Sequence, residues 1–183
     1  MSYTLDANVL LYASDEASPV HRQARTFIER MAQGPEIAYL FWPTVMAYLR
    51  IATHPAVFAR PLSIVEAIGN MEQLLTRPHI RTTGETDAFW RTFQRVTDDA
   101  LPSGNLVPDA HIVSLMVEHG VDTIWTRDRD YRRFPGIQAR DPFHLTVERR
   151  APKPRSLRAG ASGLGDTGRR AADQRPEPPA TRS

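Results

Sequence analysis

The first 143 residues alternate between two patterns of apolar and polar positions. Short, mostly apolar runs predict strands at residues 2–7, 37–42, 79–83, 121–126 and 137–141. Between these runs, apolar residues recur at helical spacing, which predicts helices at 18–34, 43–53, 61–78, 86–99 and 109–120 and a short helical turn at 129–134.

Local signals mark several helix ends. Ser18 and Pro19 predict that the helix at 18–34 begins with Ser18 as its N-cap and Pro19 at its first position, and Gly34 predicts its end. Ser63 and Glu66 have the spacing of a capping box, in which each side chain bonds to the backbone N–H of the other residue.

The alternation of strands and helices with short connections predicts a central parallel sheet covered by helices, a three-layer α/β/α fold. A chain of 183 residues, 41% of them hydrophobic, is long enough for one such domain with its own core. In folds of this kind, ligands bind at the carboxyl ends of the strands. Polar residues that follow strands are therefore the first candidates for function.

The C-terminal part of the chain has a different composition. Residues 149–183 hold nine Arg or Lys and three Asp or Glu, a net charge of +6, whereas the preceding 148 residues hold 14 and 18, a net charge of −4. Residues 148–183 are rich in Pro, Gly, Ala and Arg and contain no aromatic residue, so they cannot bury enough apolar surface to fold. We expect a domain at 1–147 and a disordered basic tail at 148–183.

Several classes of protein are disfavoured by composition. The chain has no cysteine, which excludes disulfides and thiolate metal sites, so a metal ion would be held by oxygen or imidazole ligands. The N-terminus lacks the basic segment of a signal peptide, and no apolar run has the roughly 18 residues of a membrane span. We expect a cytoplasmic protein without membrane association.

Three aspartates stand out by position. Asp6 ends the first predicted strand, Asp109 lies in the first turn of the helix at 109–120, and Asp128 follows the strand at 121–126, with Asp130 two residues on. Taken singly, Asp109 is an ordinary helix-dipole partner, and Asp128 fits a solvated turn. In a parallel sheet, however, all of them converge on one edge.

Clustered carboxylates without cysteine favour a hard cation such as Mg²⁺ or Mn²⁺, which takes oxygen ligands and offsets the repulsion between the carboxylates. Such an ion activates water and stabilises charge on a phosphate, so the reaction class that fits is hydrolysis of a phosphoester. Four arginines beside Asp128 are candidates for RNA phosphate binding or for simple charge balance: Arg127, Arg129, Arg132 and Arg133. Trp42, Trp90 and Trp125 are expected in the core.

Four stretches of the chain resemble the PIN-domain ribonucleases, and specifically the VapC toxins of type II toxin–antitoxin systems, in a subgroup common in mycobacteria. They are LDANVLLYA, LRIATHPAVFARPLSIVEA, GNLVPDAHIVSLMVEHG and TIWTRDRDYRRFPGIQARDP. The resemblance covers roughly residues 3 to 143. Any one of these stretches is weak, but their order and spacing together are specific.

The resemblance implies an endoribonuclease that depends on Mg²⁺ or Mn²⁺, forms a homodimer, cuts structured RNA such as tRNA or rRNA, and is inhibited by a cognate VapB-type antitoxin. It assigns the catalytic, metal-binding aspartates to Asp6, Asp109 and Asp128, and it gives Asn8 and Thr126 orienting roles. Many PIN domains carry a further glutamate in the helix at 43–53, where this chain has Ala47 or Tyr48. Asp130, or less plausibly Glu118, is left to supply the fourth carboxylate.

Two other functions remain to be weighed. A haloacid-dehalogenase-like phosphatase also begins with a strand-end aspartate, but it needs a second aspartate two residues later, where this chain has Asn8. A catalytically impaired PIN scaffold that only binds RNA or antitoxin is supported by the missing glutamate. The three remaining aspartates weigh against that alternative.

Overall fold

A computed structural model describes residues 2–143, so the predicted boundary after residue 147 and the predicted tail at 148–183 lie outside the described residues. The strands are β1 (Ser2–Leu5), β2 (Ile37–Phe41), β3 (Ile80–Thr83), β4 (Thr123–Trp125) and β5 (Gln138–Arg140). The helices are α1 (Ala7–Ser14), α2 (His21–Gln33), α3 (Trp42–Ala52), α4 (Ile64–Leu75), α5 (Phe89–Ala100), α6 (Leu106–Glu118) and the 3₁₀ helix η1 (Asp130–Arg133).

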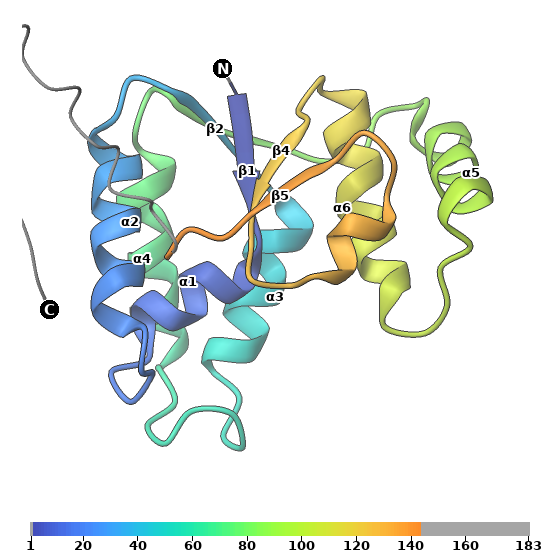
Figure 1. The fold of residues 1–183 in the computed structure, drawn as a ribbon. Helices are drawn as coiled ribbons and strands as arrows, with labels where there is room; N and C mark the ends of the chain where they lie inside the picture. Colours follow the sequence, from blue (N-terminus) through green and yellow to red (C-terminus); the bar gives the residue numbers. More distant parts are fainter. Residues whose placement is uncertain (1, 144–183) are drawn as a thin grey trace, which may run out of the picture. The chain divides into compact units, whose positions relative to one another are not determined.

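The five strands form one parallel sheet in the order β3-β2-β1-β4-β5, which confirms the predicted sheet (Figure 1). β1 is the central strand, and its Thr4 lies opposite Tyr39 of β2 and Ile124 of β4. Because all strands run in the same direction, the segments that leave β1 and β4 emerge at the same edge. Asp6 and Thr126 each follow directly after one of these two strands.

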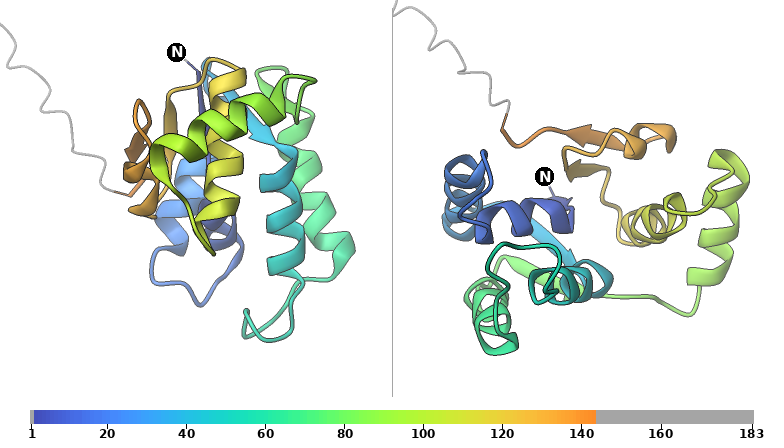
Figure 2. Two further views of the ribbon diagram at one scale, coloured as in Figure 1. Left: turned by 90° about the vertical axis from the view of Figure 1, so that its right-hand side faces the viewer. Right: turned by 90° about the horizontal axis from the view of Figure 1, so that it is seen from below.

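Helices cover both faces of the sheet, as the two rotated views in Figure 2 show, and this confirms the three-layer architecture. On one face, Leu5 and Leu40 pack with α1, α2, α3 and α4 in one core cluster. On the other face, Phe41 and Ile124 pack with α6 and with η1. Neighbouring residues such as Leu40 and Phe41 point to opposite faces, as the two-residue period of a strand requires.

Three sequence-based expectations about local structure are wrong. No helix was expected at residues 7–14, where α1 begins directly after Asp6, and α2 begins at His21 without a side-chain cap. Ser18 instead lies in the preceding turn, where its hydroxyl accepts a bond from Val20 N. Helix α6 begins three residues before Asp109. The capping box of Ser63 and the end of α2 at Gly34 are confirmed.

The tryptophans also differ from expectation. Trp42 is 47% exposed and Trp90 is 64% exposed, so neither belongs to the core, whereas Trp125 packs against it. The periodicity of a helix places residues on a face but leaves open whether another element covers that face. None of the helices between residues 2 and 143 is long and apolar enough to cross a membrane.

Candidate active site

Asp6 is held at the sheet edge by the turn from β1 into α1. Its backbone N–H donates to Trp125 O at 3.0 Å, which joins the end of β1 to the end of β4. Its carboxylate caps α1 by accepting a bond from Asn8 N at 3.4 Å. A carboxylate at a helix N-terminus accepts N–H groups that would otherwise be unpaired, and the helix dipole favours its charge.

Thr126 connects Asp6 to the segment after β4. The buried Thr126 hydroxyl donates to Asp6 Oδ2 at 2.9 Å and accepts a bond from Asp128 N at 2.9 Å. Asn8 Nδ2 donates to the same Asp6 oxygen at 2.9 Å. Asn8 and Thr126 thus fix the orientation of the Asp6 carboxylate, although 120 residues separate Thr126 from Asp6.

The other aspartates reach the same edge from different elements. Asp109 lies in the first turn of α6, and Asp128 lies between β4 and η1, where its Oδ1 accepts a bond from Asp130 N at 2.9 Å. Burial and the negative charges of Asp128, Asp6 and Asp130 raise the pKa of Asp109 to about 6, against a hydrogen bond from Tyr131 that lowers it.

The pKa of Asp6 is also raised. Burial is the main cause, and the charge of Asp128 adds to it, whereas the hydrogen bonds from Thr126 and Asn8 oppose the shift. Burial and nearby negative charges destabilise the ionised form of a carboxylate. A bound cation would offset this destabilisation, so the electrostatics of this edge favour a positively charged ligand.

We tested whether these side chains fit a divalent metal ion. Between residues 2 and 143, no three His, Asp or Glu side chains are gathered closely enough to form a ready-made metal centre. The donor set nevertheless has the right chemistry, because Asp6, Asp109, Asp128 and Asp130 offer only oxygen atoms and the charges of the other three raise the pKa of Asp109. The residues therefore fit Mg²⁺ or Mn²⁺ in donor type and charge.

Tyr131 is a residue of this edge that the sequence did not reveal. It lies in η1, is only 2% exposed and packs in the same core cluster as residues of α6, near enough to Asp109 to lower the pKa of that carboxyl. Burial raises the pKa of Tyr131 well above its usual range, and the charges of Asp6, Asp109 and Asp128 add to the shift. A tyrosine beside two aspartates and two arginines in the sequence resembles an ordinary turn, so only the fold identifies this contact.

Ala47 and Tyr48, which stand where many PIN domains carry a glutamate, lie on α3, away from the aspartates. Tyr48 on α3 is fully buried, and its hydroxyl contacts Ser14 Oγ at 2.8 Å and Asn70 Nδ2 at 3.0 Å. Ser14 is the last residue of α1, whereas Asp6 caps its beginning. The Tyr48 hydroxyl therefore contributes to packing between helices and provides no acid for the site, and Ala47 has no polar side chain.

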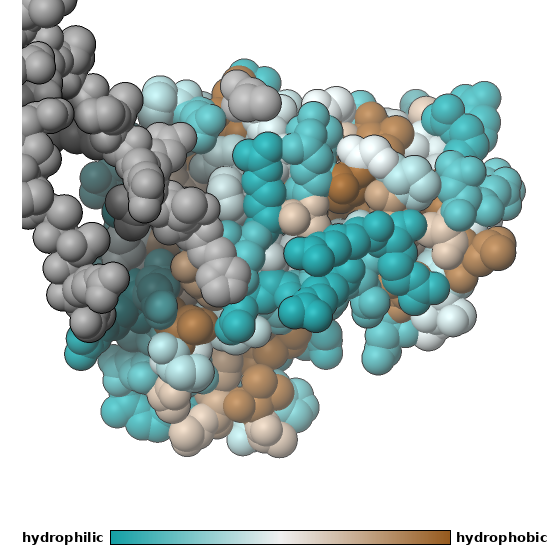
Figure 3. All heavy atoms as spheres, viewed as in Figure 1, coloured by the Kyte–Doolittle hydropathy of each residue, from teal (hydrophilic) through white to brown (hydrophobic). Residues whose placement is uncertain are grey.

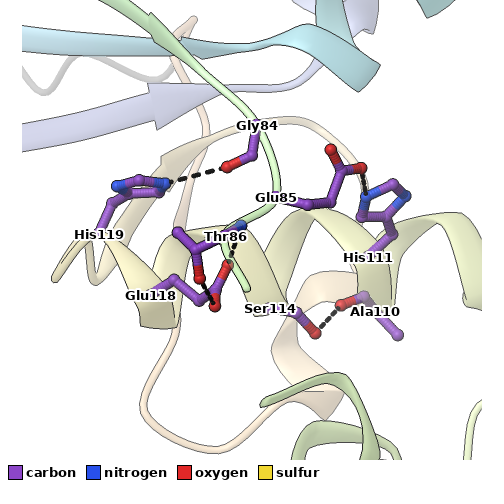
Figure 4. A network of polar contacts seen from close by, with 8 residues as sticks. All are labelled: Gly84, Glu85, Thr86, Ala110, His111, Ser114, Glu118 and His119. Carbon is purple, nitrogen blue, oxygen red and sulfur yellow. Dashed lines mark hydrogen bonds and ion pairs between the residues drawn. The ribbon is translucent and has the colours of Figure 1, made fainter. Parts of the chain in front are cut away.

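Glu118 belongs to a network that attaches α6 to the connection between β3 and α5 (Figure 4). Thr86 Oγ1 donates to Glu118 Oε1 at 2.6 Å, and His111 Nε2 lies 2.7 Å from Glu85 Oε1. Glu118 is thus engaged at the far end of α6 from Asp109. Asp130 and Glu118 are the two candidates for a fourth carboxylate. Only Asp130 lies near enough to Asp109 for its charge to raise the pKa of that carboxyl.

The four arginines beside Asp128 divide into two groups. Arg127 Nε lies 3.8 Å from Asp141 Oδ2, and its guanidinium lies over the Phe143 ring, so it is already partnered. Arg129, Arg132 and Arg133 are exposed and form no ion pair within residues 2–143. Figure 3 shows a hydrophilic surface where η1 and the segment before it lie.

The fold and the site define a parallel α/β domain with aspartates at the carboxyl edge of its central strands. The PIN domain family matches residues 3–137. Ribonuclease VapC48 of Mycobacterium tuberculosis is 50% identical over 143 residues, which cover 78% of this chain and 99% of that protein. Ribonuclease VapC37 of the same species is 30% identical over 138 residues, which cover 75% and 95%. The chain therefore belongs to the PIN-domain family, in the group of mycobacterial-like VapC toxins.

Solved structures show the same fold at low sequence identity. VapBC2 from Rickettsia felis, bound to a DNA fragment from their promoter, matches with a TM-score of 0.56 at 14% identity over 76% of this chain and 98% of the other. VapC20 of M. tuberculosis, a sarcin–ricin loop cleaving toxin, matches with a TM-score of 0.53 at 12% identity over 74% and 98%.

Proposed function

We propose that the protein is a metal-dependent endoribonuclease and the toxin of a type II toxin–antitoxin pair. The observation that supports the proposal is the hydrogen-bonded link from Asp6 through Thr126 to Asp128 at the sheet edge, together with the raised pKa values of Asp6 and Asp109, to which the charges of neighbouring aspartates contribute. The relatives named ribonucleases, which this chain matches over nearly their whole length, support the same activity.

In this proposal, Asp6, Asp109 and Asp128, with Asp130 beside them, would hold Mg²⁺ or Mn²⁺. When bound, such an ion would lower the pKa of a water and offset the charge on the phosphodiester. The residues of the chain itself orient the carboxylates and bind the substrate. Asn8 and Thr126 hold Asp6 by donating to its carboxylate.

Three exposed arginines provide a binding surface for the substrate. Arg129, Arg132 and Arg133 lie in or next to η1, beside Asp128, and guanidinium groups pair well with phosphate. We propose structured RNA, such as tRNA or rRNA, as the substrate. VapC20 of M. tuberculosis, which shares the fold, is a sarcin–ricin loop cleaving toxin.

Purified protein incubated with total cellular RNA is expected to cleave it into discrete fragments when Mg²⁺ or Mn²⁺ is present, because the carboxylates then carry the ion. Excess EDTA is expected to leave the RNA intact. The measurement is gel analysis of RNA, with mapping of the new ends. Binding of RNA or antitoxin without cleavage at any metal concentration would establish the scaffold alternative, which the absence of an acid at Ala47 and Tyr48 supports.

A VapB-type antitoxin is the proposed protein partner, and the cytoplasm, where both RNA and antitoxin occur, is the proposed location. The structural neighbour VapBC2 is a toxin–antitoxin pair. A small reading frame immediately upstream, encoding a protein with a DNA-binding N-terminal region, would identify the partner. Co-expression of that protein is expected to remove growth inhibition by this chain.

A homodimer is the proposed assembly, and α3 supports it. Trp42 and Met46 lie one turn apart on this helix and are 47% and 61% exposed, an apolar pair that a second copy would cover. The substitution Met46→Asp is expected to convert the dimer to a monomer, measured by light scattering after size exclusion. Val65→Asp, at a 76% exposed position on α4, is the matched control. A wild-type protein that is monomeric at all concentrations would contradict the dimer.

A further inference from the structure

A second group of arginines lies on α2, outside the catalytic edge. Arg22, Thr26 and Arg30 follow one another at four-residue spacing, so they share one stripe of the helix surface. Arg22 and Arg30 are exposed, and neither forms an ion pair within residues 2–143. Arg25, outside this stripe, is paired with Glu29 at 3.3 Å. The described part of the chain therefore leaves the charges of Arg22 and Arg30 available to a ligand.

These two arginines border a pocket that is otherwise largely apolar. The pocket has a volume of about 300 Å³ and lies between α2 and the segment after β5, which runs toward α2 in Figure 1. Its apolar lining comes from the buried residues Phe27 and Pro142 and from the half-buried Phe143. Arg22 and Arg30 add positive charge beside this lining. An aromatic surface next to guanidinium groups is the combination that binds single-stranded nucleic acid, because bases stack and phosphates pair.

Phe143 is held in place by contacts on several sides. Its backbone N–H donates to Asp141 Oδ1 at 2.8 Å, and its ring meets the Tyr12 ring edge-on, with the centroids 6.0 Å apart. The Arg127 guanidinium lies over the Phe143 ring, 5.8 Å from the centroid, and is itself 3.8 Å from Asp141. A side chain that is already fixed loses little conformational freedom when a ligand binds to it. Phe143 is therefore a preorganised surface for stacking.

Arg127 connects this pocket to the catalytic edge. It lies between Thr126, whose hydroxyl donates to Asp6, and Asp128. Its guanidinium contacts Phe143, which lines the pocket. An RNA strand bound at the aspartates thus has a continuous path past Arg127 to α2. This continuity favours RNA over an acidic peptide as the ligand of the pocket.

We propose that the pocket between α2 and Phe143 is a nucleotide subsite for the RNA substrate, away from the bond that is cut. Arg22 and Arg30 pair with backbone phosphates, and Phe143 stacks with a base. The inference rests on the proposed function, because it takes RNA as the substrate. Phosphate pairing and stacking accept any base, so the subsite adds affinity and orients the strand without reading its sequence.

The test is binding of a labelled single-stranded RNA of about 16 nucleotides to the full-length protein in EDTA, which prevents metal-dependent cleavage. Arg22→Gln and Arg30→Gln are each expected to weaken binding about tenfold, because a charge-assisted hydrogen bond is lost. Each should also reduce the slope of log affinity against log salt by roughly 0.7 between about 50 and 200 mM salt, the value for one phosphate contact.

Arg25→Gln is the matched control for these two variants. It removes the same charge from the same helix, but the Arg25 guanidinium is already paired with Glu29 and does not line this pocket. We expect it to bind the RNA with the affinity and the salt slope of the wild type.

A second substitution separates stacking from charge. Phe143→Leu keeps an apolar side chain but removes the aromatic face, so it should weaken RNA binding roughly tenfold and leave the salt slope unchanged. Phe143→Tyr, which keeps the ring, should bind as the wild type does.

Wild-type affinity and slope in Arg22→Gln and Arg30→Gln, or an equal loss in Arg25→Gln, would overturn the proposal. Variants that bind RNA normally but no longer bind the protein encoded by the upstream reading frame would also contradict it, because the pocket would then be a protein interface. A wild type that binds RNA in EDTA but does not cleave it with Mg²⁺ or Mn²⁺ would overturn the proposed nuclease activity and leave the subsite in place.

Discussion

Replacing Asp6 or Asp109 with asparagine is expected to lower RNA cleavage by roughly 10²–10³-fold and to remove growth inhibition on expression. Asparagine has nearly the same shape as aspartate but binds a divalent cation weakly, so the ion and its activated water are lost. The fold should survive, because asparagine is also a good N-cap at position 6 and its side-chain oxygen still accepts the bond from Thr126.

The control for these variants is Asp122→Asn. Asp122 directly precedes β4 and therefore lies at the opposite edge of the sheet from Thr126, which follows the same strand. Its carboxylate accepts a bond from the neighbouring Thr123 hydroxyl at 2.8 Å. This variant should cleave RNA at the wild-type rate. Full toxicity of Asp6→Asn and Asp109→Asn, at equal expression, would show that the carboxyl edge is not the active site.

Mg²⁺ affinity is expected to fall about tenfold for each pH unit below about 6, because the pKa of Asp109 is raised to about 6 and its protonated form cannot bind the ion. The raised pKa of Asp6 should make the decrease steeper at lower pH. The measurement is calorimetric titration with Mg²⁺ between pH 5 and pH 8. An affinity that is constant over this range would contradict the assignment of Asp109 as a ligand.

The same shift predicts the opposite effect on the metal-free fold. The unfolded chain releases the Asp109 proton near pH 3.8, whereas the folded chain keeps it to about 6. The free energy of unfolding should therefore decrease as pH rises through this interval. Asp109→Asn should remove the decrease and unfold at a higher temperature than the wild type in EDTA at pH 7.5. The difference between the two proteins should shrink at pH 4.

Much of this fold follows from local pattern. A strand followed by a helix, repeated with short connections, leaves few alternatives to a parallel sheet, and the five expected strands are all present. The position of Asp6 after the first strand and of Asp109 in the first turn of a helix could also be seen in the sequence. Helix α1 was missed because its eight residues are too few to show a clear helical period.

The sequence by itself determined the class of fold and which aspartates follow the strands or begin a helix, because these follow from periodicity and chain direction, and it predicted the carboxyl edge as the place for chemistry. Only the tertiary structure decided which side chains touch. The bond from Thr126 to Asp6 joins the end of β4 to the end of β1, and Tyr131 of η1 packs in the same core cluster as residues of α6. Such contacts depend on strand order and on the packing of helices across the sheet, neither of which leaves a mark in the spacing of neighbouring residues. The exposure of Trp42 was decided in the same way, by which elements cover it.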